Sequence, residues 1–123
     1  MIERIESVVI HENPKPHVHS RHGYFPGVAK LSDSELLALF VRGEAFESPD
    51  STTFVSRSLD GGRTWNLEQP LYDKSVLDIP TSDSLKATVL RSGTVVALGY
   101  RFHRLDPELG IDLEETDGIS PGR

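Results

Sequence analysis

The side chains with the greatest chemical versatility in this sequence gather in one short polar segment that contains three histidines. His17 and His19 alternate along the chain, and His22 follows them with Arg21 beside it. Alternate residues of an extended strand share one face, so His17 and His19 could both contact one metal ion. No carboxylate or cysteine pattern completes a standard metal site around them. A polar loop is therefore the preferred interpretation, and we predict no bound metal and no cofactor.

Composition excludes several other kinds of chemistry and several kinds of partner. The 123 residues hold no cysteine, which rules out disulfides and thiolate catalysis. The formal net charge of −6 and the lack of a Lys/Arg run argue against a nucleic-acid surface. The apolar runs are too short to span a membrane, and the first residues lack the apolar middle of a signal peptide. These features predict a cytoplasmic protein with neither a nucleic-acid nor a membrane partner.

Short strand-like runs separated by glycine, proline and polar turns predict an all-β fold. No segment shows the sustained 3.6-residue hydrophobic period of an amphipathic helix. Strands are expected at Glu6–His11, Tyr24–Leu31, Glu35–Val41, Thr52–Ser58, Trp65–Leu71, Lys86–Leu90 and Thr94–Phe102. The core is expected to include Leu39, Phe40, Trp65, Val96 and Leu98.

The most specific motif in the sequence is a tight turn between two of these strands. Residues 58–65 read Ser-Leu-Asp-Gly-Gly-Arg-Thr-Trp and fill every specified position of S-x-D-x-G-x-T-W. Asp60 is expected to accept hydrogen bonds from backbone N–H groups of its own turn, and the two glycines permit positive φ. Thr64 can add a local hydroxyl bond, and Trp65 supplies a large apolar anchor. The motif therefore predicts a β-hairpin corner.

An internal repeat indicates two copies of one sheet unit. When the chain is shifted by 59 residues, Val28–Arg42 lies over Ala87–Arg101 with four identities and coincident turns. Repeats of this size are typical of propeller blades. The second copy is expected to be incomplete, because the acidic stretch Ile111–Asp117 has poor strand character where a third strand is due.

Residues 58–65 resemble the Asp-box of the sialidase (BNR-repeat) superfamily. The segment Gly23–Gly27, with its proline, also resembles the opening of the family's first blade. The resemblance extends over Tyr24–Trp65, with a fainter similarity in Asp83–Arg101. It implies a sialidase-like β-propeller, of which this chain would hold about one and a half to two four-stranded antiparallel blades.

The resemblance predicts a single partial propeller domain over residues 1–123. The first blade is expected at about 20–72, the second begins at about 83–102, and 103–123 would be a loop or tail. The chain is either a piece of a longer propeller, which needs roughly four to eight blades, or a short protein in its own right. Open sheet edges of such a body favour self-association.

The resemblance also implies a set of residues that bind an acidic sugar. The family binds the carboxylate of sialic acid with arginines, since a planar guanidinium donates two parallel charge-assisted hydrogen bonds. Arg42 resembles one of these arginines, and Arg101 is its equivalent in the repeat. Tyr24 occupies the position of another arginine, where this sequence departs from the family, and Arg21 could substitute for it. For Arg42, a solvated charge at a strand end is the alternative.

Two aspartates resemble site residues of the same family. Asp50 lies in a loop ahead of the Asp-box, where the family places the acid/base aspartate that protonates a leaving oxygen. Asp83 precedes the second hairpin and resembles a second-blade site aspartate. The alternative for Asp50 is a simple turn residue, since aspartate is common in turns.

The function implied by the resemblance is a glycoside hydrolase that removes terminal sialic acid, or a similar acidic sugar, by retaining cleavage. Asp50 would be the acid/base and Arg42 a substrate-binding residue. The family's later arginines and its Tyr/Glu nucleophile pair have no counterpart in these 123 residues, so the chain alone is expected to be inactive. The alternative is a non-catalytic Asp-box module that binds a glycan or a protein partner, which Tyr24 favours.

Overall fold

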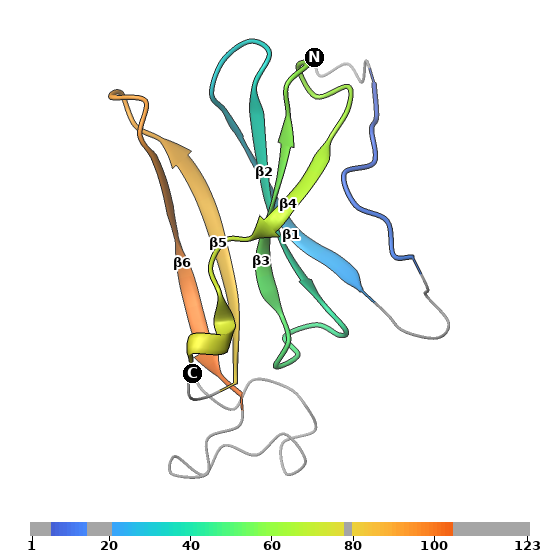
Figure 1. The fold of residues 1–123 in the computed structure, drawn as a ribbon, viewed down its shortest axis with the longest axis vertical. Helices are drawn as coiled ribbons and strands as arrows, with labels where there is room; N and C mark the ends of the chain where they lie inside the picture. Colours follow the sequence, from blue (N-terminus) through green and yellow to red (C-terminus); the bar gives the residue numbers. More distant parts are fainter. Residues whose placement is uncertain (1–5, 15–20, 78–79, 105–123) are drawn as a thin grey trace, which may run out of the picture.

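The computed structural model describes residues 6–14, 21–77 and 80–104, which form two antiparallel β-sheets (Figure 1). The first sheet has four strands in sequence order, and the second is a two-stranded hairpin. The elements are β1 (His22–Lys30), β2 (Leu36–Gly43), β3 (Thr52–Ser58), β4 (Asn66–Pro70), the short 3-10 helix η1 (Lys74–Val76), β5 (Thr81–Val89) and β6 (Val95–His103). The predicted all-β class is confirmed.

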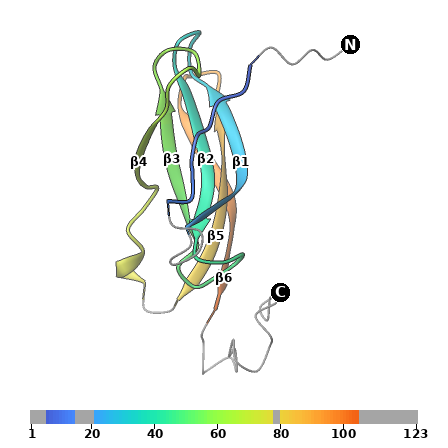
Figure 2. The same ribbon diagram turned by 90° about the vertical axis from the view of Figure 1, so that its right-hand side faces the viewer.

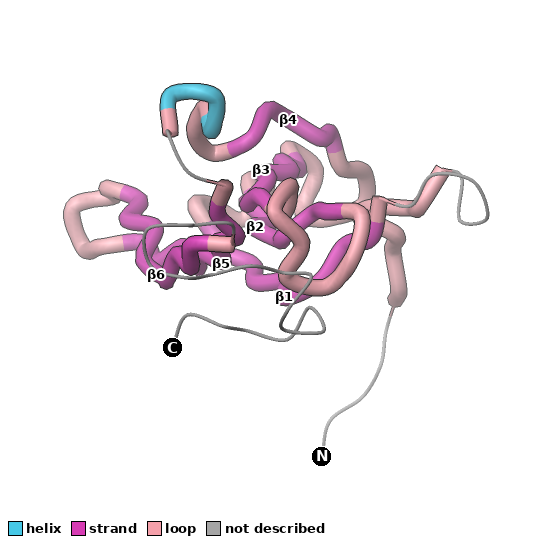
Figure 3. Tube along the Cα trace, turned by 90° about the horizontal axis from the view of Figure 1, so that it is seen from below, coloured by secondary structure: helices cyan, strands magenta, loops and turns pink. Residues whose placement is uncertain are grey.

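The hairpin lies face to face with the four-stranded sheet, so the molecule has two layers (Figures 1 and 2). Strand β5 packs against β2, β1 and β3, while β6 lies on its far side. The view along the strands separates the two layers and shows β4 at the edge of the first sheet, next to β3 (Figure 3). The predicted tail from residue 105 onward, with the acidic stretch 111–117, lies outside the described residues.

Strand β2 lies inside the first sheet, between β1 and β3, and its apolar run is buried on both faces. Leu37 and Leu39 form the core cluster with Val55 of β3, facing the hairpin. Phe40 points to the opposite face, where the ring of His11 stacks on it with centroids 5.4 Å apart. A strand covered on both sides must be apolar at successive positions, which explains the run of hydrophobic residues here.

The turn at residues 58–65 has the geometry that its sequence predicts. Gly61 and Gly62 take positive φ values of 72° and 94°. Asp60 accepts the Thr64 N–H at 2.9 Å and the Thr64 hydroxyl at 2.7 Å, while the Ser58 hydroxyl donates to it at 2.8 Å. These bonds, first those from Thr64, lower the pKa of Asp60 from 3.8 to about 2. The predicted hairpin corner is confirmed.

Residues 6–11 do not form the predicted strand. His11 holds this segment instead, because its Nε2 donates to the Arg21 carbonyl at 2.7 Å and its ring stacks on Phe40. The segment therefore covers one face of β2 through a side chain rather than through a ladder of backbone bonds.

The predicted core is right for β2 and wrong for Leu98 of β6, while Val96 of the same strand is half-buried. Leu39 and Phe40 are buried, but Leu98 is 71% exposed because it points away from the first sheet and no described residue covers that face. Trp65 is half-buried just before β4, where its Nε1 donates to the Gly62 carbonyl at 2.9 Å. Strand β5 begins at Thr81, five residues before the predicted Lys86.

Among the described residues, no helix is long and apolar enough to cross a membrane.

Candidate functional site

Most of the predicted site residues meet at one end of the sheets, opposite the turn at residues 58–65. In an antiparallel sheet every second connection lies at the same end, so the β2–β3 loop and the β4–β5 connection come together there. The end of β6 and the beginning of β1 lie at this end as well. In Figure 1 it is the lower end, which carries η1.

A pocket of about 280 Å³ opens at this end and is here called the charged pocket. Its lining includes Arg21, Arg42, Asp50, Phe54, Tyr72 and Lys74. Three of these, Arg21, Arg42 and Asp50, belong to the predicted site. The other predicted residues, Tyr24, Asp83 and Arg101, do not line it.

Arg42 holds a hydrogen-bond donor that no described residue uses. Its guanidinium lies over the Phe54 ring, 5.1 Å from the centroid. Its Nε is enclosed by protein and has no hydrogen-bond partner among the residues the structure describes. A buried polar group without a partner is costly, and an arginine offers donors in a fork that matches a carboxylate. Because Arg42 also lines the charged pocket, its guanidinium can meet an oxygen-bearing anion there.

Arg21 and Asp50 are linked across the mouth of the charged pocket. Arg21 Nη1 lies 2.7 Å from a Glu44 carboxylate oxygen and 3.4 Å from Asp50 Oδ2. Asp50 also accepts the Glu44 backbone N–H at 3.1 Å and the Ser48 hydroxyl. Its side chain is 40% exposed. Asp50 is fixed in orientation yet open to solvent, which suits contact with a ligand hydroxyl better than an enclosed proton donor.

Tyr24 braces the β2–β3 loop instead of facing the pocket. Its hydroxyl donates to the Ala45 carbonyl at 2.9 Å and contacts the Ser51 hydroxyl. Burial is the main cause that raises the pKa of Tyr24 above 10.0. Its ring also packs against Phe25 and Phe46. Tyr24 thus holds the loop that presents Asp50.

Asp83 ties the two sheets together. It is 3% exposed and accepts the Thr53 N–H at 2.9 Å and the Thr53 hydroxyl at 2.6 Å. The Tyr72 hydroxyl also donates to it, and the Arg101 guanidinium lies over the Tyr72 ring, 4.8 Å from the centroid. Asp83 and Arg101 therefore act on the pocket through Tyr72, since neither lines it.

The sequence alone did not single out Tyr72 or Lys74, which complete the pocket wall. Lys74 Nζ donates to the Ser51 carbonyl at 2.8 Å and to the Thr81 carbonyl, and so joins the β2–β3 loop to the start of β5. Burial lowers the pKa of Lys74, while burial and the bond with Asp83 raise that of Tyr72. For Tyr72, its position directly after a predicted strand that ends at the site was the available signal.

The histidine segment contributes little to the described site. His17 and His19 lie outside the described residues, and His22 is exposed near Asn13. Within residues 6–14, 21–77 and 80–104, no three His, Cys, Asp or Glu side chains are grouped to hold a metal ion.

Comparison with known protein families, curated proteins and solved structures finds no match to this chain.

Proposed function

We propose that the two sheets are successive blades of a sialidase-like propeller and that the charged pocket binds the carboxylate of an acidic sugar. The observation that carries the proposal is that two arginines, Arg21 and Arg42, line one pocket. A carboxylate ligand would accept charge-assisted hydrogen bonds from the guanidinium groups that line the pocket.

Three features support the propeller as the scaffold. The Asp-box turn closes a four-stranded sheet whose strands follow in sequence order, as in a propeller blade. The hairpin β5–β6 matches β1–β2 in the internal repeat and stacks on the first sheet. The buried tether from Thr53 to Asp83 then fixes one sheet on the other.

The pocket suits sugar binding more directly than turnover. Asp50 is placed to accept a hydrogen bond from a sugar hydroxyl, and Arg21 is shared between Glu44 and Asp50 at the mouth. Burial and the hydrogen bond to Asp83 raise the pKa of Tyr72, which disfavours the phenolate that a tyrosine nucleophile would use in a retaining reaction. In a hydrolase, the described residues would bind substrate and the nucleophile would come from another part of the site.

A binding titration with a matched pair of variants tests the proposal. N-acetylneuraminic acid is titrated into the chain by calorimetry or NMR, with N-acetylglucosamine as the neutral control sugar. Arg42→Leu is expected to weaken binding by about ten- to a hundredfold, since a hydrogen bond to a charged group contributes about 1.5–3 kcal/mol. Arg91→Leu removes an equal charge at the far end of the β5–β6 hairpin and leaves binding unchanged. Equal affinities of the two variants, or equal binding of the neutral sugar, would refute the proposal.

A non-catalytic glycan-binding module is the second candidate, and Tyr24 is the observation that favours it. Where the family has a substrate-binding arginine, this hydroxyl is committed to Ala45 and Ser51. A fluorogenic sialoside tests whether the chain is active by itself. Under both candidates the chain is expected to bind the sugar without hydrolysing it, and hydrolysis that Asp50→Asn abolishes would overturn that expectation.

A further inference from the structure

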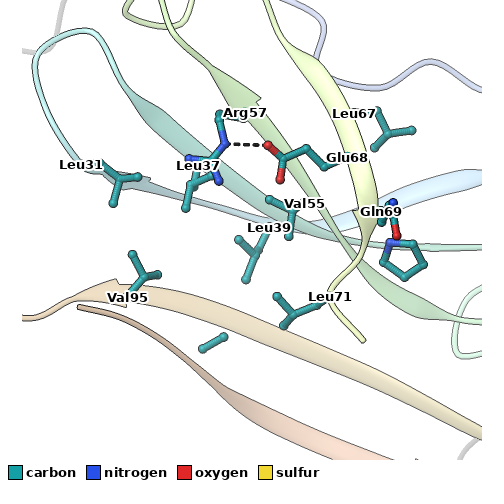
Figure 4. A pocket seen from close by; sticks show the side chains of 12 residues that line it. Leu31, Leu37, Leu39, Val55, Arg57, Leu67, Glu68, Gln69, Leu71 and Val95 are labelled. Carbon is teal, nitrogen blue, oxygen red and sulfur yellow. Dashed lines mark hydrogen bonds and ion pairs between the residues drawn. The ribbon is translucent and has the colours of Figure 1, made fainter. Parts of the chain in front are cut away.

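An open groove lies between β6 and the outer half of the four-stranded sheet (Figure 4). Its volume is about 960 Å³, and its lining combines apolar side chains, among them Leu37, Leu39, Val55, Val95 and Ala97, with the polar side chains of Arg57, Glu68 and Gln69. Figure 4 shows Leu37, Leu39 and Val55 on one side of the space and Val95 across from them. Leu37, Leu39 and Val55 are buried members of the core cluster, so the groove reaches the edge of the core.

The groove runs beside a sheet edge that carries unused backbone hydrogen-bonding groups. Strand β6 pairs with β5 along residues 95–103, and no described strand pairs with its other edge. Val95–Tyr100 contains neither a charge nor a proline, although natural edge strands usually carry such protection. The edge therefore offers donors and acceptors along its length to an extended chain.

The internal repeat indicates that the groove corresponds to the position of a β-strand. A shift of 59 residues places β2 over residues 95–102 of β6. In the first sheet, β2 is flanked by β1 and β3, whereas β6 has only β5, the counterpart of β1. The groove thus lies at the place that β3 takes in the first sheet, where Leu36 pairs with Ser58 and Val41 with Thr53.

We propose that the groove accepts one extended polypeptide strand, paired antiparallel to β6 in the register that β3 has on β2. Backbone bonds to β6 would provide the affinity, and alternate side chains would enter the groove and pack against the edge of the core. A second copy of the chain is a poorer occupant. Because β3 and β4 already overhang the space beside β6, the four-stranded sheet of a copy paired edge to edge would compete for the same volume.

A peptide with the sequence of residues 50–60 is the probe, because it contains β3 itself. The labelled peptide is titrated into the 123-residue chain and binding is followed by fluorescence anisotropy. The control is the same peptide with proline in place of Val55, which cannot pair as a central strand. We expect saturable binding of the first peptide and none of the second.

Two variants of β6 provide a matched test of the site. Val95 lines the groove, while Leu98 lies on the opposite face of the same strand, and both are exposed. Val95→Asp is expected to weaken peptide binding by about tenfold or more, whereas Leu98→Asp changes it by less than about twofold. Circular dichroism verifies that both variants are folded.

Several outcomes would overturn the inference. One is the absence of saturable binding by the folded chain, and another is an equal loss of affinity in the two variants. A dimer in sedimentation experiments that Val95→Asp dissociates would assign the groove to a second copy instead. None of these measurements depends on the charged pocket, so the result is independent of sugar binding.

Discussion

The Asp83 tether gives the sharpest test of how the two sheets are held together. Asp83→Ala removes a 3% exposed carboxylate that accepts the backbone N–H and hydroxyl of Thr53 and the hydroxyl of Tyr72. The two hydroxyls can rotate toward other acceptors. The Thr53 N–H cannot, because it belongs to a strand and its residue is fully buried.

The expected loss follows from these contacts. Hydrogen bonds to a charged acceptor contribute about 1.5–3 kcal/mol, and a buried donor left without a partner costs about 1–3 kcal/mol. Relief from burying a charge offsets part of this sum, which leaves a loss of about 3 kcal/mol in the free energy of unfolding. Asp83→Asn keeps one acceptor oxygen for Thr53, so its loss is expected to be about 1 kcal/mol.

Urea unfolding measures these differences. The single tryptophan, Trp65, reports by fluorescence and circular dichroism reports on the strands. A loss of about 3 kcal/mol lowers the urea midpoint by about 1–3 M. Asp33→Ala is the control, because Asp33 is fully exposed at a turn and its removal leaves the midpoint unchanged. If Asp83→Ala unfolds at the same urea concentration as Asp33→Ala, the tether does not stabilise the sheet packing and the reasoning fails.

Three further changes test the turns and the core. Gly62→Ala is expected to lower the free energy of unfolding by about 1–2 kcal/mol, which is more than Gly93→Ala lowers it. Both glycines have positive φ, but only at Gly62 would an added Cβ lie 3.2 Å from a side chain. Equal urea midpoints of the two variants would contradict this. Because the pKa of Asp60 falls from 3.8 to about 2 on folding, its contribution is complete above about pH 4 and is lost as pH falls toward 2. Asp60→Asn should therefore flatten Tm over that range, and an unchanged acid profile would count against the turn. Leu39→Ala should lower the free energy of unfolding in urea by about 2–5 kcal/mol, and a loss below about 1 kcal/mol would show that the core cluster is not tightly packed.

The strands of the first sheet and the turn at residues 58–65 could be predicted because their determinants are local. All the hydrogen bonds of Asp60 come from residues 58–64, so the motif specifies its own geometry wherever it is placed. Strand β3 has the predicted bounds of Thr52–Ser58, and β2 differs from its prediction by one or two residues. Arg21, Arg42 and Asp50 meet in one pocket, as expected for residues at the same end of antiparallel strands.

The elements that were missed depend on contacts between distant segments. Residues 81–84 are polar and read as a loop, yet they are a buried part of β5, because Asp83 and Ser82 find partners on other segments. The sequence of residues 6–11 predicts a strand, but the stacking of His11 on Phe40 holds this segment against β2 instead. Lys74 joins the β2–β3 loop to the start of β5 by donating to the Ser51 and Thr81 carbonyl groups, and no local sequence pattern predicts such a role.

The sequence by itself determined the all-β class, the corner at Asp60 and the alternation that makes each strand, because these depend on φ preferences and on hydrogen bonds between near neighbours. Only the tertiary structure decided which polar groups are buried, which apolar residues stay exposed and which charges are left without a partner. Those properties depend on what lies across from a side chain, and in a sheet that neighbour is set by strand pairing and layer packing rather than by adjacent residues. Leu98 and Arg42 show this in opposite ways: Leu98 is exposed where a core was expected, and the half-buried Arg42 has an enclosed Nε that no described residue pairs with.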